Sequence, residues 1–419
     1  MLHLTAPNQP PSNLELICPT SSGFGGYICI NFTKTESRML NFFKKKQEPK
    51  SSLLKEEKSS TRSRFNTLRV QDITRETANS VSVAFAVPEN LSNDYKFTPG
   101  QYLTLEHEIK GEKVRRSYSL CSSPLEGELR VAIKRVEDGK FSGFANESLT
   151  VGTEMQVMTP DGKFTANPNV ANKKNYVGFA AGSGITPVFS ILKSLLEVET
   201  ESTFTLFYGN KTTQSVIFRD ALDALKNKYM NRLEIHHVLS REDQGSDWLK
   251  GHINSEKIRH FSKTFFKPAE VADYFICGPE SMINNVNETL LELGVDKGTI
   301  HYELFTSPSQ KMAHKTTVNA DKSSEKLQSE VTVILDGDET HFKVASNGFS
   351  ILDAALEAGA DVPYACKGAV CCTCRAKVLE GSVEMDMNYA LEDDEVEDGF
   401  VLTCQSHPTS EKVIVSFDE

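Results

Sequence analysis

The segment Cys366-Lys-Gly-Ala-Val-Cys371-Cys-Thr-Cys374 contains the spacing C-x4-C-x2-C, and a further cysteine follows after 29 residues. Two irons bridged by two sulfides need four thiolates that converge on one place, and this spacing supplies three of them from one tight loop. Gly368 and Ala369 allow the backbone to curl close to the cluster, where its N–H groups can bond to sulfur. The pattern predicts a [2Fe–2S] cluster held by Cys366, Cys371, Cys374 and Cys404.

A zinc site and a disulfide pair are the alternatives to a cluster. Zinc sites usually combine two C-x2-C pairs, and the segment contains only one such pair. Cys372 is a fifth thiol inside the loop, and we interpret it as a bystander because its neighbours already fill the spacing. The remaining cysteines are scattered, which indicates no disulfide framework and favours a reducing, cytoplasmic compartment. They are Cys18, Cys29, Cys121 and Cys277.

Length and charge narrow the class of protein. A chain of 419 residues is long enough for two to four domains. No apolar run approaches the roughly 20 residues that span a bilayer, so stable membrane insertion is not expected. The net charge is −11, and residues 330–419 hold five Lys/Arg against 19 Asp/Glu. This acidic region, densest at Glu392-Asp-Asp-Glu395, predicts either a docking face for a basic partner or a solvated face, and its sign disfavours nucleic acid.

The chain divides into a tail, three domains and a linker. Residues 1–62 mix Pro, Ser and Asn and then become rich in lysine, which predicts a disordered tail. They show no basic region followed by an apolar stretch and a cleavage site, so a secretory signal is not expected, and Met39 is an alternative start of translation. Residues 307–329 are polar without hydrophobic periodicity, which predicts a linker between the second and third domains.

Residues 63–168 predict a small antiparallel β-barrel. The runs 80–85, 102–105 and 128–133 alternate or nearly alternate between apolar and polar residues, with turns such as Pro99-Gly100 between them. Residues 169–306 have a different rhythm, in which strands alternate with helices. Such alternation predicts a parallel sheet with crossover helices. The expected strands are 176–181, 203–208, 233–239 and 273–277, and the expected helices include 187–197 and 218–226.

Residues 330–419 predict a mixed α+β domain around the cysteine segment. The runs 331–335 and 341–344 form a hairpin pattern. Ser350-Ile-Leu-Asp353 has the pattern of a capping box, which opens a helix to Ala358 that ends at Gly359.

Two motifs in the barrel segment carry flavin chemistry. In Arg116-Ser-Tyr-Ser119, the guanidinium can pair with a flavin pyrophosphate, Tyr118 can lie beside the ring system, and the Ser119 hydroxyl can reach the N5 edge. Further on, Ile133-Lys-Arg-Val136 and Gly139-Lys-Phe-Ser142 offer backbone N–H groups and a hydroxyl to phosphate. Taken alone, Arg-x-Tyr-Ser is also compatible with an ordinary strand.

Two motifs in the α/β segment suit a nicotinamide dinucleotide. Ala181-Gly-Ser-Gly-Ile-Thr-Pro187 follows a strand and opens a helix. There Gly182 and Gly184 permit close approach of a pyrophosphate, and Thr186 can bond to it. Cys277-Gly-Pro-Glu280 closes a later strand and places its thiol at the carboxyl edge of the sheet, where open α/β folds bind ligands. A buried core thiol is the alternative for Cys277.

These motifs, in this order, resemble the ferredoxin–NADP reductase superfamily, and the cysteine segment resembles a fused plant-type ferredoxin. Within this group, the stretches 207–213, 383–392 and 399–408 resemble the reductase subunits of phenylacetyl-CoA epoxidases, which serve diiron oxygenases of phenylacetate breakdown. The resemblance implies a multidomain fold with an FAD-binding antiparallel β-barrel, an NAD(P)-binding parallel sheet and a β-grasp ferredoxin domain.

The resemblance also implies roles for particular residues. FAD is bound by Arg116, Tyr118 and Ser119, and Thr186 and Cys277 line the nicotinamide site, with Ser119 and Cys277 placed for catalysis. Phe305 is expected to shield the flavin. Leu239-Ser-Arg-Glu242 resembles the stretch that binds a 2′-phosphate, which favours NADPH over NADH. The contacts would come from Ser240, Arg241 and Lys211. The alternative for Arg241 is a surface residue paired with Glu242 or Asp243.

The resemblance implies an enzyme that takes hydride from NADPH onto FAD and passes single electrons to the [2Fe–2S] cluster and then to a diiron oxygenase. That oxygenase would dock on the acidic ferredoxin domain. Two alternatives remain at this stage. One is a reductase for another oxygenase, a desaturase or a hybrid-cluster protein. The other is a non-enzymatic iron–sulfur carrier or sensor.

Overall fold

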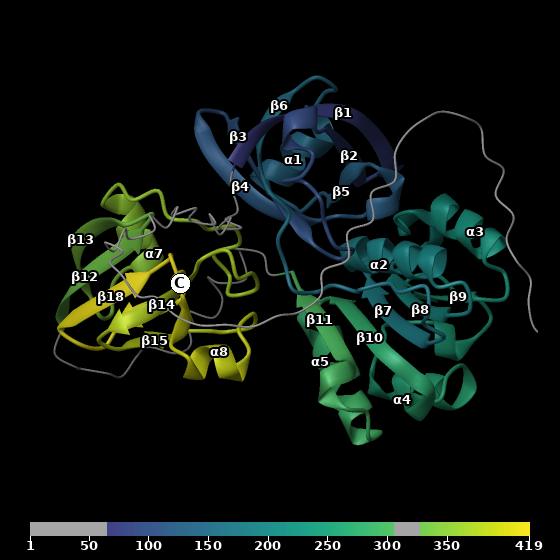
Figure 1. The fold of residues 1–419 in the computed structure, drawn as a ribbon. Coiled ribbons are helices and arrows are strands. Elements are labelled where there is room, and N and C mark those ends of the chain that lie inside the picture. Colours follow the sequence, from purple (N-terminus) through teal and green to yellow (C-terminus); the bar gives the residue numbers. More distant parts are fainter. Residues whose placement is uncertain (1–64, 306–326) are drawn as a thin grey trace, which may run out of the picture. The chain divides into compact units, whose positions relative to one another are not determined.

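The computed structural model describes residues 65–305 and 327–419 (Figure 1). The predicted tail, the alternative start at Met39, and most of the predicted linker lie outside these residues. Among the helices of the described ranges, none combines the length and apolarity of a membrane crossing.

The first part of the chain forms the predicted antiparallel barrel. Its sheet has the order β4-β3-β6-β1-β2-β5, and a bridge between Leu120 and Val131 joins the two ends of the sheet. Buried aliphatic side chains such as Leu103, Leu105 and Ile133 fill the interior. The elements are β1 (Phe65–Thr77), β2 (Ser80–Ala86), β3 (Tyr102–Ile109), β4 (Glu112–Ser119), β5 (Leu129–Lys134), α1 (Lys140–Glu147) and β6 (Glu154–Met158).

The second part is the predicted parallel sheet, in the order β11-β10-β7-β8-β9. Helices α2 and α3 pack on one face, and α4 and α5 pack on the other, which gives two separate cores. The elements are β7 (Asn175–Ala181), α2 (Ile185–Val198), β8 (Thr203–Asn210), α3 (Arg219–Lys228), β9 (Leu233–Leu239), α4 (Ser255–Thr264), β10 (Val271–Gly278), α5 (Glu280–Glu292) and β11 (Ile300–Leu304).

The strand order reverses between β7 and β10, and there the turn after β7 meets the end of β10. A Cβ atom on Gly184 would lie 2.1 Å from the carbonyl oxygen of Cys277. Only glycine permits this approach. It brings residues 181–187, here called the nucleotide loop, against the Cys277-Gly-Pro-Glu280 motif. The carboxyl edge beside such a reversal is where open α/β sheets bind their ligands.

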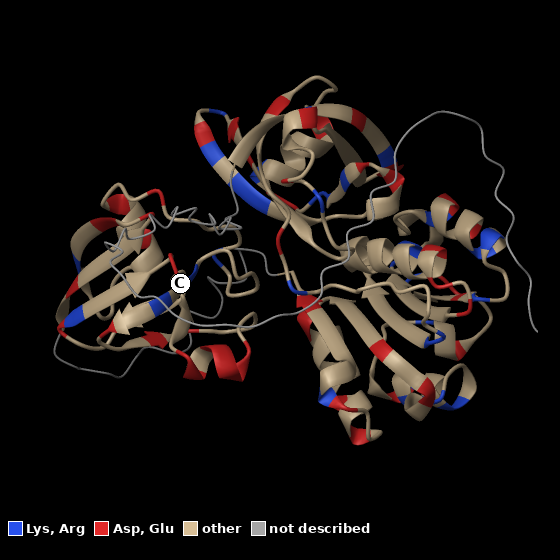
Figure 2. Cartoon of the chain, in the orientation of Figure 1, with Lys and Arg blue, Asp and Glu red and all other residues tan. Residues whose placement is uncertain are grey.

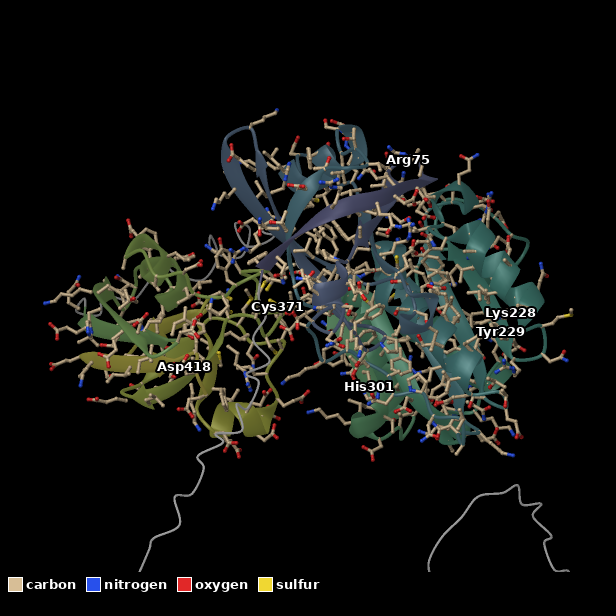
Figure 3. All side chains as sticks on the ribbon, turned by 45° about the horizontal axis from the view of Figure 1, so that its top comes forward. Arg75, Lys228, Tyr229, His301, Cys371 and Asp418 are labelled. Carbon is tan, nitrogen blue, oxygen red and sulfur yellow. The ribbon has the colours of Figure 1, made fainter. Side chains whose placement is uncertain are left out.

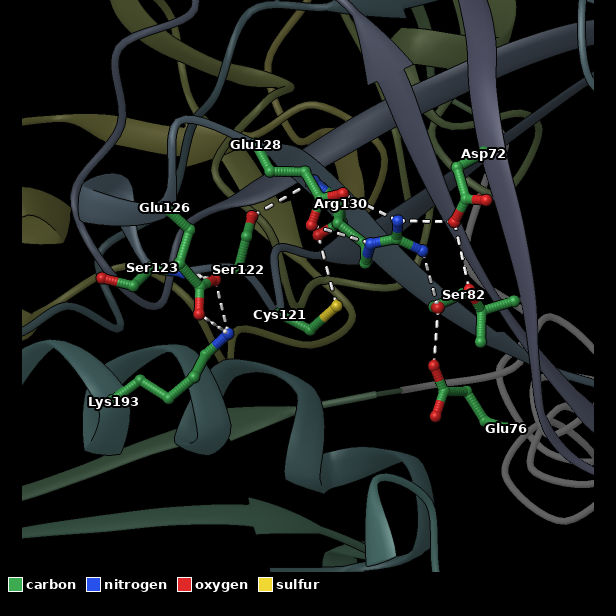
Figure 4. A network of polar contacts seen from close by, with 11 residues as sticks. Asp72, Glu76, Ser82, Cys121, Ser122, Ser123, Glu126, Glu128, Arg130 and Lys193 are labelled. Atoms are coloured by element: carbon green, nitrogen blue, oxygen red, sulfur yellow. Dashed lines mark hydrogen bonds and ion pairs between the residues drawn. The ribbon is translucent and has the colours of Figure 1, made fainter. Parts of the chain in front are cut away.

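Helix α2 also joins the parallel sheet to the barrel through polar contacts (Figure 4). The Ser190 hydroxyl donates to the carbonyl of Ser122 at 2.6 Å, and the Lys193 ammonium pairs with the Glu126 carboxylate. Behind this contact, Arg130 on β5 bonds to carboxylates of neighbouring residues, Asp72 and Glu128. The barrel and the parallel sheet therefore share a polar, partly buried seam.

The third part is a mixed five-stranded sheet with α7 packed on it, the β-grasp arrangement predicted for the ferredoxin domain. The Ser350 hydroxyl accepts a bond from the N–H of Asp353 at the start of α7, as the capping pattern predicts. The elements are β12 (Gln328–Leu335), β13 (Asp338–Ala345), α7 (Ile351–Glu357), β14 (Arg375–Glu380), β15 (Val383–Met385), α8 (Asp393–Glu397), β16 (Phe400–Leu402), β17 (Ser406–Pro408) and β18 (Lys412–Ser416).

The end of the predicted linker needs a correction. We predicted a linker to residue 329, but β12 begins at Gln328. Ser329 is fully buried and pairs with Val344 across the hairpin. Tertiary pairing therefore draws two polar residues into a strand that their composition does not indicate.

Replacing Gly184 with alanine tests the close approach of the nucleotide loop to β10. The new methyl group meets rigid backbone, so we expect the free energy of unfolding to fall by about 1–3 kcal/mol. Urea unfolding followed by circular dichroism measures this change. Gly143→Ala in α1 is the matched control, because nothing lies within 4 Å of its new Cβ atom. Equal stability of the Gly184 variant and the wild type would contradict the packing argument.

Candidate functional site

The cluster loop, residues 366–374, holds its backbone in a curled conformation. Lys367 and Ala369 have left-handed φ angles of 49° and 63°, which L-residues rarely adopt. The N–H of Gly368 donates to the Cys366 sulfur at 3.1 Å, and the sulfurs of Cys366 and Cys371 lie 3.2 Å apart. Figure 3 labels Cys371 among the side chains of the chain. The loop curls as predicted, although the left-handed residues are Lys367 and Ala369 rather than Gly368.

The four predicted ligand thiols form two pairs. The Cys371 thiol donates a hydrogen bond to the Cys366 sulfur, and a hydrogen bond also joins Cys374 and Cys404. The Thr403 hydroxyl and N–H both donate to the carbonyl of Cys374, which holds the second pair together. In a [2Fe–2S] cluster each iron takes two thiolates and two bridging sulfides, so two pairs fit this group. Within the described ranges, no three or more His, Cys, Asp or Glu residues gather in a way that could hold a single metal ion.

Cys372 turns away from these pairs. Its thiol donates to the carbonyl of Ala390 at 3.2 Å, and burial raises its pKa to about 12. The geometry is consistent with the predicted bystander role.

The barrel and the parallel sheet meet at Glu303. The Ser119 hydroxyl, at the end of β4, donates to the Glu303 carboxyl at 2.8 Å. Cys277 on β10 is the register neighbour of Glu303 on β11, and its side chain is fully buried. The structure therefore brings together the two residues that we predicted for catalysis, Ser119 and Cys277, around a carboxyl group that sequence reasoning missed.

Burial raises the pKa of Glu303 to about 8, so the carboxyl keeps its proton at neutral pH. The site favours the neutral form of the carboxyl, because ionisation away from water carries a desolvation cost. A signal for it was present in the sequence, because His301-Tyr-Glu-Leu-Phe305 places one acid in an otherwise largely apolar strand. The prediction drawn from that strand concerned Phe305 alone.

A cavity of about 100 Å³ lies beside Ser119 and Glu303. It is smaller than a three-ring flavin, and the Phe305 side chain, 38% exposed, lines it. The shielding role of Phe305 stays a prediction. The full lining is Tyr102, Arg116, Ser117, Ser119, Glu303, Leu304, Phe305, Cys366, Val370 and Cys371, which includes two predicted cluster ligands.

The remaining flavin residues lie around the same end of the barrel. Arg116 donates to the carbonyl of Arg115, and no carboxylate of the described residues pairs with it, so its charge is available to a phosphate. Tyr118 packs on Phe141 of α1, with ring centroids 5.6 Å apart. These contacts suit a pyrophosphate and a ring system respectively.

The predicted phosphate loop lies at the start of α1. Gly139 is the N-cap residue of this helix, and Ile133 is buried in β5. The Ser142 hydroxyl accepts from the N–H of Val136 and donates to the carbonyl of Gly139. This hydroxyl braces the loop from inside, so the backbone N–H groups at the helix start are better placed for phosphate.

A basic residue that we did not predict, Lys134, lies against the turn at Gly182. Gly182 has a φ angle of 56°, and the Lys134 ammonium lies 3.1 Å from the position that a Cβ atom on Gly182 would take. Lys134 comes from β5, next to the predicted Ile133. The Thr186 hydroxyl donates to the carbonyl of Ser183, so in this structure it closes the turn. Lys134 and the N–H groups of the turn together fit a pyrophosphate.

The predicted 2′-phosphate residues are brought together by backbone bonds. The N–H groups of Ser240 and Arg241 donate to the carbonyls of Asn210 and Lys211. Arg241 does not form the ion pair of the alternative interpretation. Glu242 instead accepts two bonds from Thr213, and Asp243 pairs with Lys250.

The fold and these sites define an oxidoreductase of the ferredoxin reductase type, with flavin, nicotinamide and iron–sulfur parts in one chain. Three family models match it: "Oxidoreductase FAD-binding domain" at 67–166, "Oxidoreductase NAD-binding domain" at 179–288, and "2Fe-2S iron-sulfur cluster binding domain" at 333–409. They confirm the predicted cofactors, FAD, NAD(P)H and a [2Fe–2S] cluster.

The chain belongs to the family of iron–sulfur flavoprotein reductases that includes two curated relatives. It is 44% identical to a component of the 1,2-phenylacetyl-CoA epoxidase of Escherichia coli (strain K12), over 84% of this chain and 98% of the relative. It is 33% identical to the ferredoxin reductase component of the 3-ketosteroid-9-alpha-monooxygenase of Rhodococcus rhodochrous, over 85% and 97%. The predicted membership of the superfamily is thereby confirmed.

A solved structure matches most of this chain in fold. Phthalate dioxygenase reductase matches with a TM-score of 0.51 and 23% identity, over 84% of this chain and 98% of that chain. At this identity the match supports the fold, and the fold agrees with the three predicted domains.

Glu303→Gln tests whether the buried carboxyl acts on the flavin. Above pH 8 an ionised Glu303 places negative charge beside a group that gains electrons. We therefore expect the wild-type rate of flavin reduction by NADPH to fall as pH rises through about 8, and the rate of the neutral variant to lose this dependence. Anaerobic stopped-flow absorbance measures both rates. Glu154→Gln, an exposed acid on β6, is the control and should keep the wild-type profile; identical profiles for Glu303→Gln and wild type would exclude the role.

Proposed function

We propose that the chain is the NADPH-dependent reductase component of a diiron oxygenase, namely a phenylacetyl-CoA epoxidase. The observation that carries this proposal is the cavity that Ser119, Glu303 and Cys371 line together, because it joins the flavin end of the barrel to the cluster loop. The 44% identity to the Escherichia coli epoxidase component, over almost its full length, supports the choice of oxygenase.

In this proposal each site residue has a definite task. When bound, FAD accepts hydride from NADPH and releases its electrons singly to the cluster. Arg116 and the N–H groups at the start of α1 hold the flavin phosphates, and Lys134 with the turn at Gly182 holds the dinucleotide. Ser119 and Glu303 supply neutral hydrogen-bonding groups at the ring edge. Cys366 with Cys371 holds one iron, and Cys374 with Cys404 holds the other.

The acidic ferredoxin domain is the proposed docking face for the oxygenase. Asp393, Asp394 and Glu397 of α8 are exposed and form a dense acidic group (Figure 2). Exposed charge of one sign speeds encounter with a basic partner surface. The cluster chemistry favours a reducing compartment, so we propose a cytoplasmic location.

A second candidate is a reductase for a different oxygenase. The 33% identity to the ketosteroid monooxygenase reductase over nearly the whole chain favours it, since the same three-part domain organisation serves another substrate there. The two candidates share every step inside this chain and differ only in the acceptor.

Purified protein tests the electron route first. We expect absorption bands of both flavin and a [2Fe–2S] cluster, and bleaching of both by NADPH. Reconstitution with phenylacetyl-CoA epoxidase or ketosteroid monooxygenase oxygenase components then separates the candidates by product formation. Protein without flavin, or without iron and sulfide, would rule out both candidates.

Arg241→Ala tests the choice of nucleotide. Because one hydrogen bond to a charged group contributes about 1.5–3 kcal/mol, we expect the KM for NADPH to rise about tenfold or more and the KM for NADH to change little. Steady-state reduction of ferricyanide measures both constants. Arg219→Ala is the control, because Arg219 pairs with Asp220 on α3. An equal rise for both nucleotides in the Arg241 variant would refute the 2′-phosphate assignment.

Serine substitutions test the ligand set. Cys404→Ser should abolish the [2Fe–2S] absorption and electron paramagnetic resonance signals, because one iron loses a thiolate. Cys372→Ser is the matched control and should retain both signals. A cluster that survives in the Cys404 variant and disappears in the Cys372 variant would reverse the assignment.

A further inference from the structure

Tyr102 lies between the flavin end of the barrel and the cluster loop. It is the first residue of β3 and pairs in register with Ser119 of β4, the residue that bonds to Glu303. Its side chain is only 6% exposed and packs against Ala365 and Cys371. One buried ring therefore touches a predicted cluster ligand and belongs to the strand next to the predicted flavin contact.

The hydroxyl of Tyr102 makes a specific bond to the cluster loop. It lies 2.9 Å from the Thr373 hydroxyl and 3.3 Å from a carboxylate oxygen of Asp161. A carboxylate accepts, so the phenol donates to Asp161 and the Thr373 hydroxyl donates to the phenol. Thr373 stands between Cys371 and Cys374 and is 8% exposed.

Tyr102 is held firmly on the barrel side. Its N–H donates to the carbonyl of Asp161 at 2.8 Å, and its carbonyl accepts from the N–H of Asp161 at 3.1 Å. The backbone thus fixes both the ring and the carboxylate that orients its hydroxyl. The phenol oxygen is therefore already in place to accept a hydrogen bond from the Thr373 hydroxyl of the cluster loop.

Two more contacts join the same two parts of the chain. The Arg115 guanidinium donates to the carbonyl of Tyr364 at 3.1 Å and lies 4.1 Å from the centre of its ring. Lys163 forms an ion pair with Glu395 of α8, and its side chain is 51% exposed. Of these contacts, the buried Tyr102–Thr373 bond is the one that reaches a residue between two predicted cluster ligands.

We propose that Tyr102 and Thr373 are positioning residues for electron transfer from flavin to cluster, and that their bond holds the cluster loop at the flavin end of the barrel. The proposal rests on the proposed function. The two electrons of each NADPH cross this contact one at a time, and the cluster passes each to the external acceptor before it receives the next. No covalent bond of the protein forms or breaks in this step.

Tyr102→Phe and Thr373→Val each remove one hydroxyl and keep most of the packing. In anaerobic stopped-flow mixing of the holoenzyme with NADPH, we expect cluster reduction to slow about tenfold or more, because small displacements of reacting groups are costly. Flavin reduction should slow much less. The double variant should be no slower than either single variant, since both changes break the same bond.

Tyr95→Phe is the matched control. Tyr95 is another buried tyrosine of the barrel, and its hydroxyl donates to the carbonyl of Val157 at 2.6 Å, within the barrel itself. Its loss removes the same group without touching the cluster loop. We expect the wild-type rates of flavin and cluster reduction in this variant.

Hydrogen–deuterium exchange of the oxidised enzyme gives a readout without turnover. Peptides that cover residues 364–374 should exchange faster in Tyr102→Phe and Thr373→Val than in wild type or Tyr95→Phe. Unchanged exchange and unchanged cluster reduction, with an intact cluster by electron paramagnetic resonance, would overturn the proposal. If Thr373→Val loses its cluster, Tyr102→Phe decides, because Tyr102 lies outside the loop. A wild-type enzyme without flavin or cluster would instead overturn the proposed function.

Discussion

The bond between the Ser119 hydroxyl and the Glu303 carboxyl joins the barrel to the parallel sheet. Ser119 ends a barrel strand and Glu303 lies on the edge strand of the parallel sheet, so their 2.8 Å contact requires both domains in one orientation. Burial raises the pKa of Glu303 to about 8, which leaves the carboxyl neutral at physiological pH. The Ser119 hydroxyl and the Glu303 carboxyl are therefore uncharged hydrogen-bonding groups at this end of the barrel.

The conformation of the cluster loop also depends on the domain that surrounds it. Left-handed conformations at Lys367 and Ala369 cost free energy, and they persist because the surrounding domain holds the loop. The four predicted ligand thiols lie in two hydrogen-bonded pairs. The thiol of Cys372 instead donates a hydrogen bond to the carbonyl of Ala390 and belongs to neither pair.

Family membership and the packing of this chain determine different properties of the protein. Three family models and a relative at 44% identity define the cofactors and the family. They do not say how the cluster loop meets the flavin end of the barrel. That contact is visible only in the packing of Tyr102 on Cys371 and in its bond to Thr373, two residues that lie 271 positions apart.

Local patterns were sufficient to predict the domain order, several strands and helices, and the two glycines of the nucleotide loop, because each depends on neighbours within a few residues. Glu303, Lys134 and Tyr102 escaped that reasoning. A single acid, lysine or tyrosine in a strand has no distinctive pattern, and its role arises from burial and from partners on other elements. Likewise, Gln328 and Ser329 have the composition of a linker, and only their hairpin partners draw them into a strand. The sequence alone determined which cofactors the chain carries, and only the tertiary structure decided which side chains meet between them, since desolvation and long-range pairing exist only in the folded chain.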